Sequence, residues 1–88
     1  MIWVTDAKPL ADFRLWIEFS DSTRGEIDLR DFIERDTRPV VAALRSPAMF
    51  ASLRVDMDTV VWDSGFDLAP EFLYERIKPE RRGKERVL

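Results

Sequence analysis

The stretch FRLWIEF, residues 13–19, constrains the fold more than any other part of this 88-residue chain. Its hydrophobic residues come at every second position, with polar residues and one tryptophan between them: Phe13, Leu15, Ile17 and Phe19. Side chains alternate between the two faces of a β-strand, so the pattern is typical of a strand with one face against a core. Trp16 must then lie on the opposite face.

Two further strands are predicted beside this one. Residues 2–8 begin with β-branched and aromatic side chains and stop at Pro9, as a strand would. After the sequence DSTRG at 21–25, which offers Asp, Ser and Gly for a hairpin turn, residues 26–29 return with alternating hydrophobic side chains. The three strands would follow one another as a meander.

The middle of the chain is predicted to be helical but interrupted by proline. Pro39 and Pro47 each suit the first position of a helix, and neither suits a helix interior. Thr37 and Ser46 lie just before them and are expected to cap two short helices.

Beyond these helices, residues 53–62 are predicted to form a second hairpin with its turn at 56–58. The segments together predict an α+β fold: a single small domain in which an antiparallel meander or hairpin sheet of about five strands packs against two or three short helices. We place this domain at residues 1–77, followed by a basic C-terminal tail at 78–88 that we expect to be flexible.

Charge is distributed unevenly along the chain. Residues 78–88 carry five basic and two acidic side chains, so residues 1–77 carry a net charge of −6 within the total of −3. DNA binding depends on many phosphate contacts from Lys and Arg, and an acidic body is a poor match for it. We expect no direct nucleic-acid binding by the body; indirect contact through a partner protein stays open.

The chain contains no His and no Cys. Histidine general bases, Ser-His-Asp triads, ordinary zinc sites and disulfides are therefore excluded within it. No apolar run approaches the roughly 20 residues needed to cross a bilayer, and the N-terminus lacks the pattern of a secretory signal. We expect a cytoplasmic protein that is not an enzyme, needs no cofactor and does not bind a membrane.

The segment WDSGFDLAPEFLYER, residues 62–76, concentrates carboxylates that could bind a small ligand or a divalent metal. Asp63, Asp67 and Glu71 would be the ligands, because hard cations prefer several oxygen ligands. Their spacing does not match the EF-hand loop, and turn formation explains them more simply. We prefer a strand-to-helix corner, in which the Asp67 carboxylate accepts backbone N–H bonds from a helix beginning at Pro70.

Two tryptophans are candidates for a binding surface. Trp16 points away from the buried side of its strand. The environment of Trp3, on the first strand, is equally open. Either another part of the chain covers them, or they anchor an interface, since Trp is enriched at binding hot spots. Pairing between chains along an open sheet edge is a third route to association.

The pattern W-x-x-G-x-D-L-x-P-E-x-L-Y near the end of the body is typical of one protein family. It is met by Trp62, Gly65, Asp67, Leu68, Pro70, Glu71, Leu73 and Tyr74. With the preceding segments, it makes residues 2–77 resemble the small bacterial family known as domain of unknown function 2442. The family usually has an Asp-Gly pair after its second strand; here Ser22 follows Asp21, and Gly25 comes later, which suggests a longer hairpin loop.

The resemblance implies a compact α+β domain and brings no catalytic residues with it. Family members resemble stand-alone proteins or modules joined to other domains, some of them DNA-binding. Some are encoded beside another small protein in a manner similar to toxin–antitoxin pairs. We therefore expect a module that binds a protein partner or a second copy of itself, with the small-ligand or metal site at Asp63, Asp67 and Glu71 as the alternative.

Overall fold

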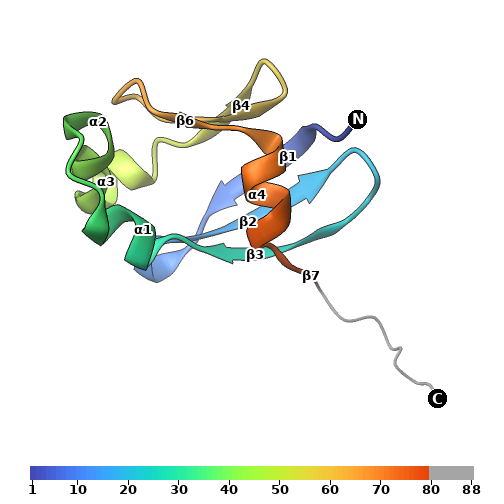
Figure 1. Cartoon of the computed structure of the whole chain (residues 1–88), viewed down its shortest axis with the longest axis horizontal. Coiled ribbons are helices and arrows are strands. Elements are labelled where there is room, and N and C mark those ends of the chain that lie inside the picture. The colour runs from blue at the N-terminus through green and yellow to red at the C-terminus, as the bar shows by residue number, and fades with distance from the viewer. Residues whose placement is uncertain (80–88) are drawn as a thin grey trace.

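The computed structural model of the chain describes residues 1–79 and divides them among short strands and short helices (Figure 1). The strands are β1 (Val4–Pro9), β2 (Arg14–Phe19), β3 (Arg24–Asp28), β4 (Arg54–Asp56), β5 (Thr59–Val61), β6 (Asp67–Leu68) and β7 (Lys78–Pro79). The helices are η1 (Ala11–Phe13), α1 (Arg30–Arg35), α2 (Pro39–Ala42), η2 (Ala43–Arg45), α3 (Pro47–Phe50) and α4 (Pro70–Arg76).

The strands form two antiparallel sheets, one in the order β1-β2-β3-β7 and one in the order β4-β5-β6. The predicted α+β class is confirmed. The expected single sheet of about five strands is wrong, because residues 1–79 contain seven strands in two sheets. Two of these strands, β6 and β7, have two residues each, which is too short to leave an alternating pattern in the sequence.

The central strand of the larger sheet is β2, and it shows the predicted alternation. Leu15 and Ile17 are fully buried, whereas Trp16 lies on the other face, opposite Lys8 of β1 and Glu26 of β3. The assignment of Phe13 to this strand is wrong, because Phe13 belongs to the turn η1 that joins β1 to β2.

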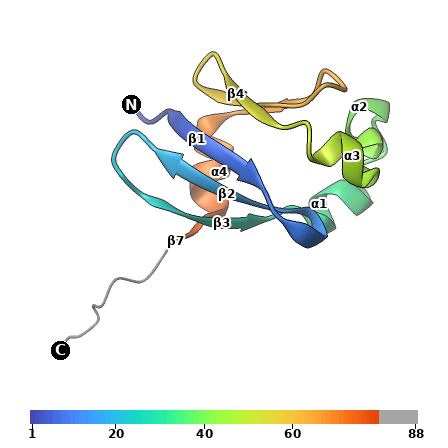
Figure 2. The same cartoon turned by 180° about the vertical axis from the view of Figure 1, so that it is seen from behind.

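Helix α4 covers the inner face of the larger sheet, as Figure 1 shows. The Tyr74 ring lies edge-on to the Phe19 ring, with centroids 5.0 Å apart. The outer face, turned toward the viewer in Figure 2, has no helix over it. The core therefore lies between this sheet, α4, the smaller sheet and the helices α1 to α3.

Proline begins three of the helices, as predicted for Pro39, Pro47 and Pro70. The predicted Ser46 cap is also confirmed, since its Oγ accepts a hydrogen bond from the Met49 amide at 3.3 Å. The caps expected from Thr37 and Asp67 are wrong. Arg38 and Ala69 take those N-cap positions, and neither makes a side-chain cap hydrogen bond.

The β2–β3 loop covers residues 20–23, and Gly25 is not part of it. Gly25 is buried within β3, opposite Ile17, so the turn role expected for this glycine is wrong. Ser22 adopts the left-handed backbone in its place, with φ of 72°.

The turn between β4 and β5 has two residues, Met57 and Asp58, with φ of 52° and 70°. Positive φ at both central residues is the mark of a type I′ hairpin turn, which normally takes Asn and Gly. The Val4 amide donates to the Asp58 carbonyl at 2.9 Å and links the two sheets.

Strand β7 carries the larger sheet two residues beyond the boundary at 77 that the sequence suggests. Lys78 and Pro79 pair with Glu26 and Gly25 of β3. The remainder of the predicted tail, residues 80–88, lies outside the described residues. Within residues 1–79, no helix has the length and apolar character needed to span a membrane.

Candidate functional site

A row of six aromatic rings runs from the turn η1, through the helical end of the molecule, to α4. The helical end consists of α1, α2, η2 and α3. Successive ring centroids are 5.5, 6.1, 5.8, 6.0 and 5.4 Å apart along the row Phe13, Phe50, Trp62, Phe66, Phe32 and Phe72. Phe50, Trp62 and Phe66 are buried. The other rings of the row are only half-buried: Phe13, Phe32 and Phe72.

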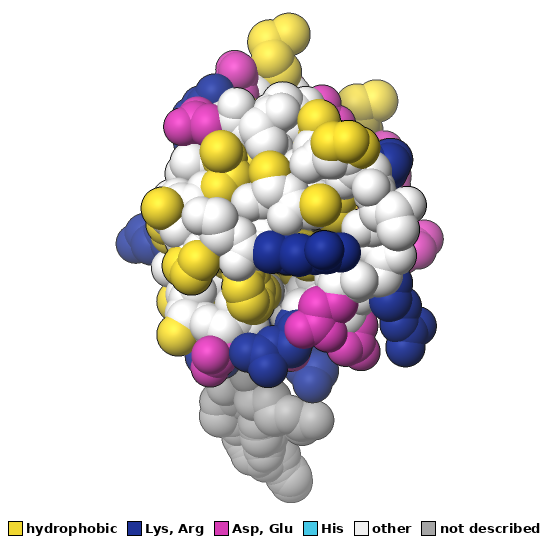
Figure 3. Space-filling model, turned by 90° about the vertical axis from the view of Figure 1, so that its left-hand side faces the viewer, with side chains coloured by type: hydrophobic (Ala, Val, Ile, Leu, Met, Phe, Trp, Pro, Cys, Tyr) yellow, Lys and Arg dark blue, Asp and Glu magenta, His cyan; other side chains and the backbone are white. Residues whose placement is uncertain are grey.

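The surface of the helical end mixes hydrophobic side chains with charged ones (Figure 3). Three arginines pack on the aromatic row: Arg30 over Phe13 at 5.9 Å, Arg38 over Phe66 at 5.4 Å, and Arg76 over Phe72 at 4.6 Å. Each guanidinium gains a cation–π contact and shields the ring beneath it from water.

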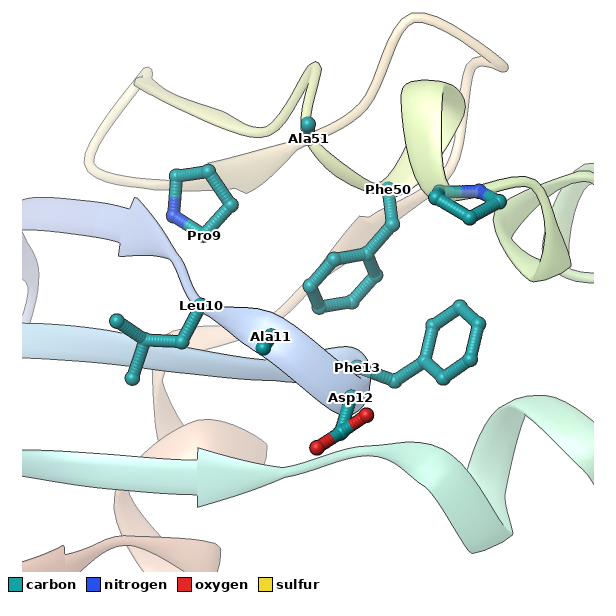
Figure 4. Close-up of a pocket in the computed structure, with 8 residues that line it drawn as sticks. Pro9, Leu10, Ala11, Asp12, Phe13, Phe50 and Ala51 are labelled. Atoms are coloured by element: carbon teal, nitrogen blue, oxygen red, sulfur yellow. The ribbon is translucent and has the colours of Figure 1, made fainter.

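An apolar pocket of about 340 Å³ opens at the Phe13 end of the row, where the β1–β2 turn meets α3 (Figure 4). Its lining residues are Pro9, Leu10, Ala11, Asp12, Phe13, Pro47, Phe50 and Ala51. Pro9 and the ring of Phe50 bound one side of the pocket, and the ring of Phe13 stands next to Phe50. The small side chains of Ala11 and Ala51 leave the hollow open.

The turn that forms one wall of this pocket is strained. Asp12 and Phe13 both have left-handed backbones, with φ of 62° and 61°. The left-handed conformation costs an ordinary residue roughly 1–2 kcal/mol, and for a bulky residue such as Phe13 it is uncommon. Strain of this kind gathers at functional sites, where the surrounding structure holds it in place.

The start of α1 supplies the contacts that hold the strained turn. The Leu29 amide donates to the Phe13 carbonyl at 3.0 Å. Arg30 pairs with the Asp12 carboxylate at 3.4 Å and lies over the Phe13 ring. The pocket wall therefore depends on residues that are separated from it in the sequence by two strands, β2 and β3.

A second, polar pocket of about 400 Å³ lies between α1 and α4, near the other end of the aromatic row. We call it the arginine pocket, and its lining residues are Asp31, Phe32, Arg35, Asp36 and Arg76. The Arg76 guanidinium lies over both Phe72 and Phe32, at 4.6 and 5.6 Å from the ring centroids.

Asp36, at the edge of the arginine pocket, is held by Arg38. The guanidinium donates to both carboxylate oxygens, with the shortest contact at 2.6 Å, and the Arg38 amide donates at 2.9 Å. These charge-assisted bonds lower the pKa of Asp36 to about 2 and raise that of Arg38. The Asp36 charge is thus offset locally.

The residues of the W-x-x-G-x-D-L-x-P-E-x-L-Y pattern form a corner between β5 and α4. Trp62 is 2% exposed and donates its indole N–H to the Phe50 carbonyl at 3.0 Å. Leu68 and Leu73 are buried in the same core, and Gly65 makes the turn with φ of 95°. Pro70 begins α4.

Tyr74, the last residue of the pattern, ties α4 to the β2–β3 loop. Its hydroxyl donates to the Asp21 carboxylate at 2.6 Å, and this hydrogen bond lowers the pKa of Asp21. The pattern thus accounts for packing and chain direction.

The carboxylates considered as a metal site are used elsewhere or stand apart. Asp63 pairs with Arg54 at 2.7 Å, Asp67 lies in β6 opposite Val61, and Glu71 lies exposed in the first turn of α4. Within residues 1–79, no three acidic side chains are grouped so that they could hold a metal ion.

The two candidate interface tryptophans lie in different surroundings. Trp16 is half-buried on the outer face of the larger sheet, and the Lys8 ammonium lies 5.6 Å from its ring centroid. Trp3 precedes β1 and is 43% exposed; its backbone exchanges hydrogen bonds with Ser20. Neither tryptophan lines either pocket.

Sequence reasoning missed the residues that line both pockets. Nothing in a periodic pattern marks Ala11 or Ala51, and Phe13 fitted the strand pattern too well to be assigned to a turn. A weaker signal was present: 11 of the 14 basic residues are Arg, and five of these lie at positions 30, 35, 38, 45 and 76. Arginine among aromatics is typical of interfaces.

Comparison with known proteins gives one family and one related structure. A family model described as "Protein of unknown function (DUF2442)" matches residues 4–79. The chain is also similar to the crystal structure of a protein named "Putative DNA Binding Protein NE0471" from Nitrosomonas europaea, with a TM-score of 0.73 and 25% sequence identity. The similarity covers 89% of this chain but 50% of that one. No curated protein matches.

Proposed function

This chain belongs to the DUF2442 family of proteins of unknown function, and from that premise we propose that it is a non-enzymatic module that binds a protein partner. The binding site is the apolar pocket between η1 and α3. The observation that carries the proposal is the composition of this pocket, whose walls are hydrophobic apart from Asp12.

The pocket suits an apolar side chain of a polypeptide better than it suits a free metabolite. Small-molecule sites combine apolar walls with several convergent polar groups that fix the ligand. Here the one charged lining residue, Asp12, already pairs with Arg30. An apolar side chain presented by a partner needs no such groups, and interfaces are commonly anchored by such a side chain in a pocket.

The sheet edges give weaker support to association by strand pairing. In the larger sheet, β1 ends in Pro9 and β7 in Pro79, and proline has no amide hydrogen to donate. The Val4 amide at the start of β1 is already bonded to Asp58. In the smaller sheet, the outer strands have three and two residues.

The absence of enzymatic activity is part of the proposal. A general acid or base works best with a pKa near the operating pH, which for a carboxyl group means a raised value. The pKa values of Asp21 and Asp36 are lowered instead, by hydrogen bonds from Tyr74 and Arg38.

Any contact with nucleic acid is proposed to run through the partner. The related Nitrosomonas europaea protein is named for DNA binding, and its chain is twice as long as the part that matches here. The net charge of −6 on residues 1–77 opposes direct phosphate binding. As the partner, we propose a small protein encoded beside this one, in the manner of a toxin–antitoxin pair.

Co-purification with the product of the neighbouring gene tests this function. Ala51→Glu places a charge in the apolar pocket, and Ala48→Glu places the same charge at an exposed position of α3 that is not among the lining residues. We expect Ala51→Glu to lose the partner and Ala48→Glu to retain it, with both variants folded by circular dichroism. A monomer by light scattering that retains no neighbour product, or equal retention by the two variants, would refute the proposal.

A further inference from the structure

We propose that the arginine pocket is a second binding site, which takes a carboxylate group between the guanidiniums of Arg35 and Arg76, above the ring of Phe32. This inference does not depend on the apolar pocket or on the protein partner assigned to it. It rests on the two arginines and on the charge balance of the pocket. It also rests on Arg45, which donates to the backbone carbonyls at the end of α1 that could otherwise accept from Arg35.

Arg76 lies against two aromatic rings and keeps its donors free. The central carbon of its guanidinium lies over the rings of Phe72 and Phe32, at 4.6 and 5.6 Å from their centroids. These cation–π contacts use no N–H acceptor, so the N–H groups remain available to a bidentate oxyanion. Within residues 1–79, Arg76 has no hydrogen bond or ion pair to any other residue.

Arg35 lies in the last turn of α1 and lines the same cavity. An arginine at this position would commonly donate to the free carbonyls at the C-terminus of its helix. Arg45 already donates to three carbonyls at this end of the helix, those of Ile33, Glu34 and Asp36, at 3.2–3.4 Å. No carboxylate in residues 1–79 forms an ion pair with Arg35.

The charge balance of the pocket fits a ligand group with a single negative charge. Of its two carboxylates, Asp36 is offset by Arg38, and its pKa of about 2 keeps it an acceptor and never a donor. The remaining charged lining residues are Asp31, Arg35 and Arg76, and their charges sum to one positive charge. A carboxylate completes this balance, whereas a dianionic phosphate exceeds it.

The partly buried ring of Phe32 forms an apolar floor below the Arg76 guanidinium. A charge-assisted hydrogen bond beside such a surface competes with less water than it would in the open solvent. The pocket thus combines hydrogen-bond donors with an apolar surface that strengthens their hydrogen bonds to a ligand.

Titration with sodium acetate, followed by NMR of the arginine Nε–Hε groups and backbone amides, tests the assignment. We expect saturable shifts at Arg35, Arg76 and the Phe32 amide, which sodium chloride at equal ionic strength does not produce. Sodium phosphate above neutral pH should bind more weakly than acetate. Shifts that never saturate, or phosphate binding tighter than acetate, would overturn the proposal.

Substitutions provide the second arm of this test. Arg76→Gln, Arg35→Gln and Arg76→Lys should each weaken acetate binding about tenfold, because a charge-assisted bidentate contact is lost. Arg24→Gln removes the same charge from the outer face of the larger sheet and should leave binding unchanged. Equal weakening by Arg24→Gln would reduce the effect to net charge and contradict the site.

A third experiment, titration with a short peptide, shows whether the carboxylate comes from a protein or from a small molecule. The capped peptide acetyl-AAEAA-amide, compared with its glutamine version, presents one glutamate side chain on a polypeptide. Tighter binding of the glutamate peptide than of acetate assigns the site to an acidic protein segment, and equal binding assigns it to a small free carboxylate. Ala51→Glu should leave acetate binding intact, so failure of the apolar pocket and failure of this site are distinguishable.

Discussion

At the scale of single residues, the backbone conformations of three turns are the least expected feature of this protein. Within residues 1–79, five residues other than glycine have positive φ: Asp12, Phe13, Ser22, Met57 and Asp58. Aspartate tolerates this region better than most residues, but Phe and Met gain nothing from it. The turn at Phe13 forms a pocket wall, whereas the turn at Met57 leaves that side chain 89% exposed.

Restoring the residues that a type I′ turn prefers should stabilise the β4–β5 hairpin. We expect Met57→Asn combined with Asp58→Gly to raise the free energy of unfolding by about 1 kcal/mol, since it relieves two left-handed residues. For a domain of this size, that corresponds to about 4–8 °C in Tm, which differential scanning calorimetry measures. A lower Tm would show that the Met57 side chain supports the fold.

The ion pair between Asp36 and Arg38 should appear in the pH dependence of stability. The pKa of Asp36 is lowered from 3.8 to about 2 in the folded protein, so its contribution is complete above about pH 4. It is lost as the pH falls through 2. Urea unfolding between these pH values should show a steeper decline for the wild type than for Asp36→Asn.

A thermodynamic cycle provides the control for this pair. Arg38→Gln should remove the same part of the pH dependence as Asp36→Asn, and the double variant should remove no more. A pH dependence that survives in Asp36→Asn would assign the effect to another carboxylate.

The alternating residue pattern predicts which side chains are buried, but it does not predict where the pockets lie. The alternation correctly placed Leu15 and Ile17 inside and Trp16 on the other face, because burial follows side-chain direction along a strand. It could not reveal that Phe13 leaves the strand, since a left-handed backbone is imposed by tertiary contacts with Leu29 and Arg30. The pocket that Phe13 lines was hidden for the same reason.

At the scale of secondary structure, proline and capping residues decide where the short helices begin. Three helices start at a proline, which the sequence shows directly. Caps are harder to predict, because a side chain must also reach the first amides of its helix. Ser46 does so, while Asp67 is held in β6 by its pairing with Val61.

Two alanine substitutions test this difference between the two caps. Ser46→Ala should lower the free energy of unfolding by about 1 kcal/mol, because the Met49 amide loses its acceptor. Asp67→Ala should change it by less than about 0.5 kcal/mol, as expected for an exposed position without a cap bond. Chemical denaturation of both variants measures the contrast, and a larger loss in Asp67→Ala would restore the capping role that the sequence suggests.

The division into two sheets could not be read from the sequence. Strands β6 and β7 have two residues each, and β7 pairs with β3, which lies far from it in the sequence. Their pairing is set by the corner from Trp62 to Pro70 and by the direction in which α4 leaves it. Strand identity is a local property, whereas sheet membership is a property of the whole chain.

At the scale of the whole molecule, both pockets are lined by residues at or next to the helical end. The larger sheet extends from this end toward the opposite side of the molecule (Figures 1 and 2). The outer face of the larger sheet is a mixed ladder of charges, with ion pairs such as Arg14 to Glu26 at 2.7 Å. Such a face is well hydrated, and the apolar ring of Trp16 on it is partly covered by Lys8. The functional surfaces we propose are therefore concentrated at one end.

The net charge of the body gives a whole-molecule prediction about DNA. Fluorescence anisotropy with a random-sequence duplex should show no saturable binding at physiological salt, because residues 1–77 carry a net −6. Any weak binding at low salt should disappear when residues 80–88, with their four basic side chains, are removed. Tight, salt-insensitive binding by the shortened chain would contradict this expectation.

Strand β7 and the N-terminus leave the folded body at the side away from the helical end, as Figure 1 shows. A fluorophore, a biotin handle or a second folded domain attached after residue 79 would begin beside β3, in the larger sheet. Tethering the protein to a sensor surface by either end should consequently leave both pockets open to solution. The domain would then be attached through its larger sheet, with the two proposed binding pockets facing the solution.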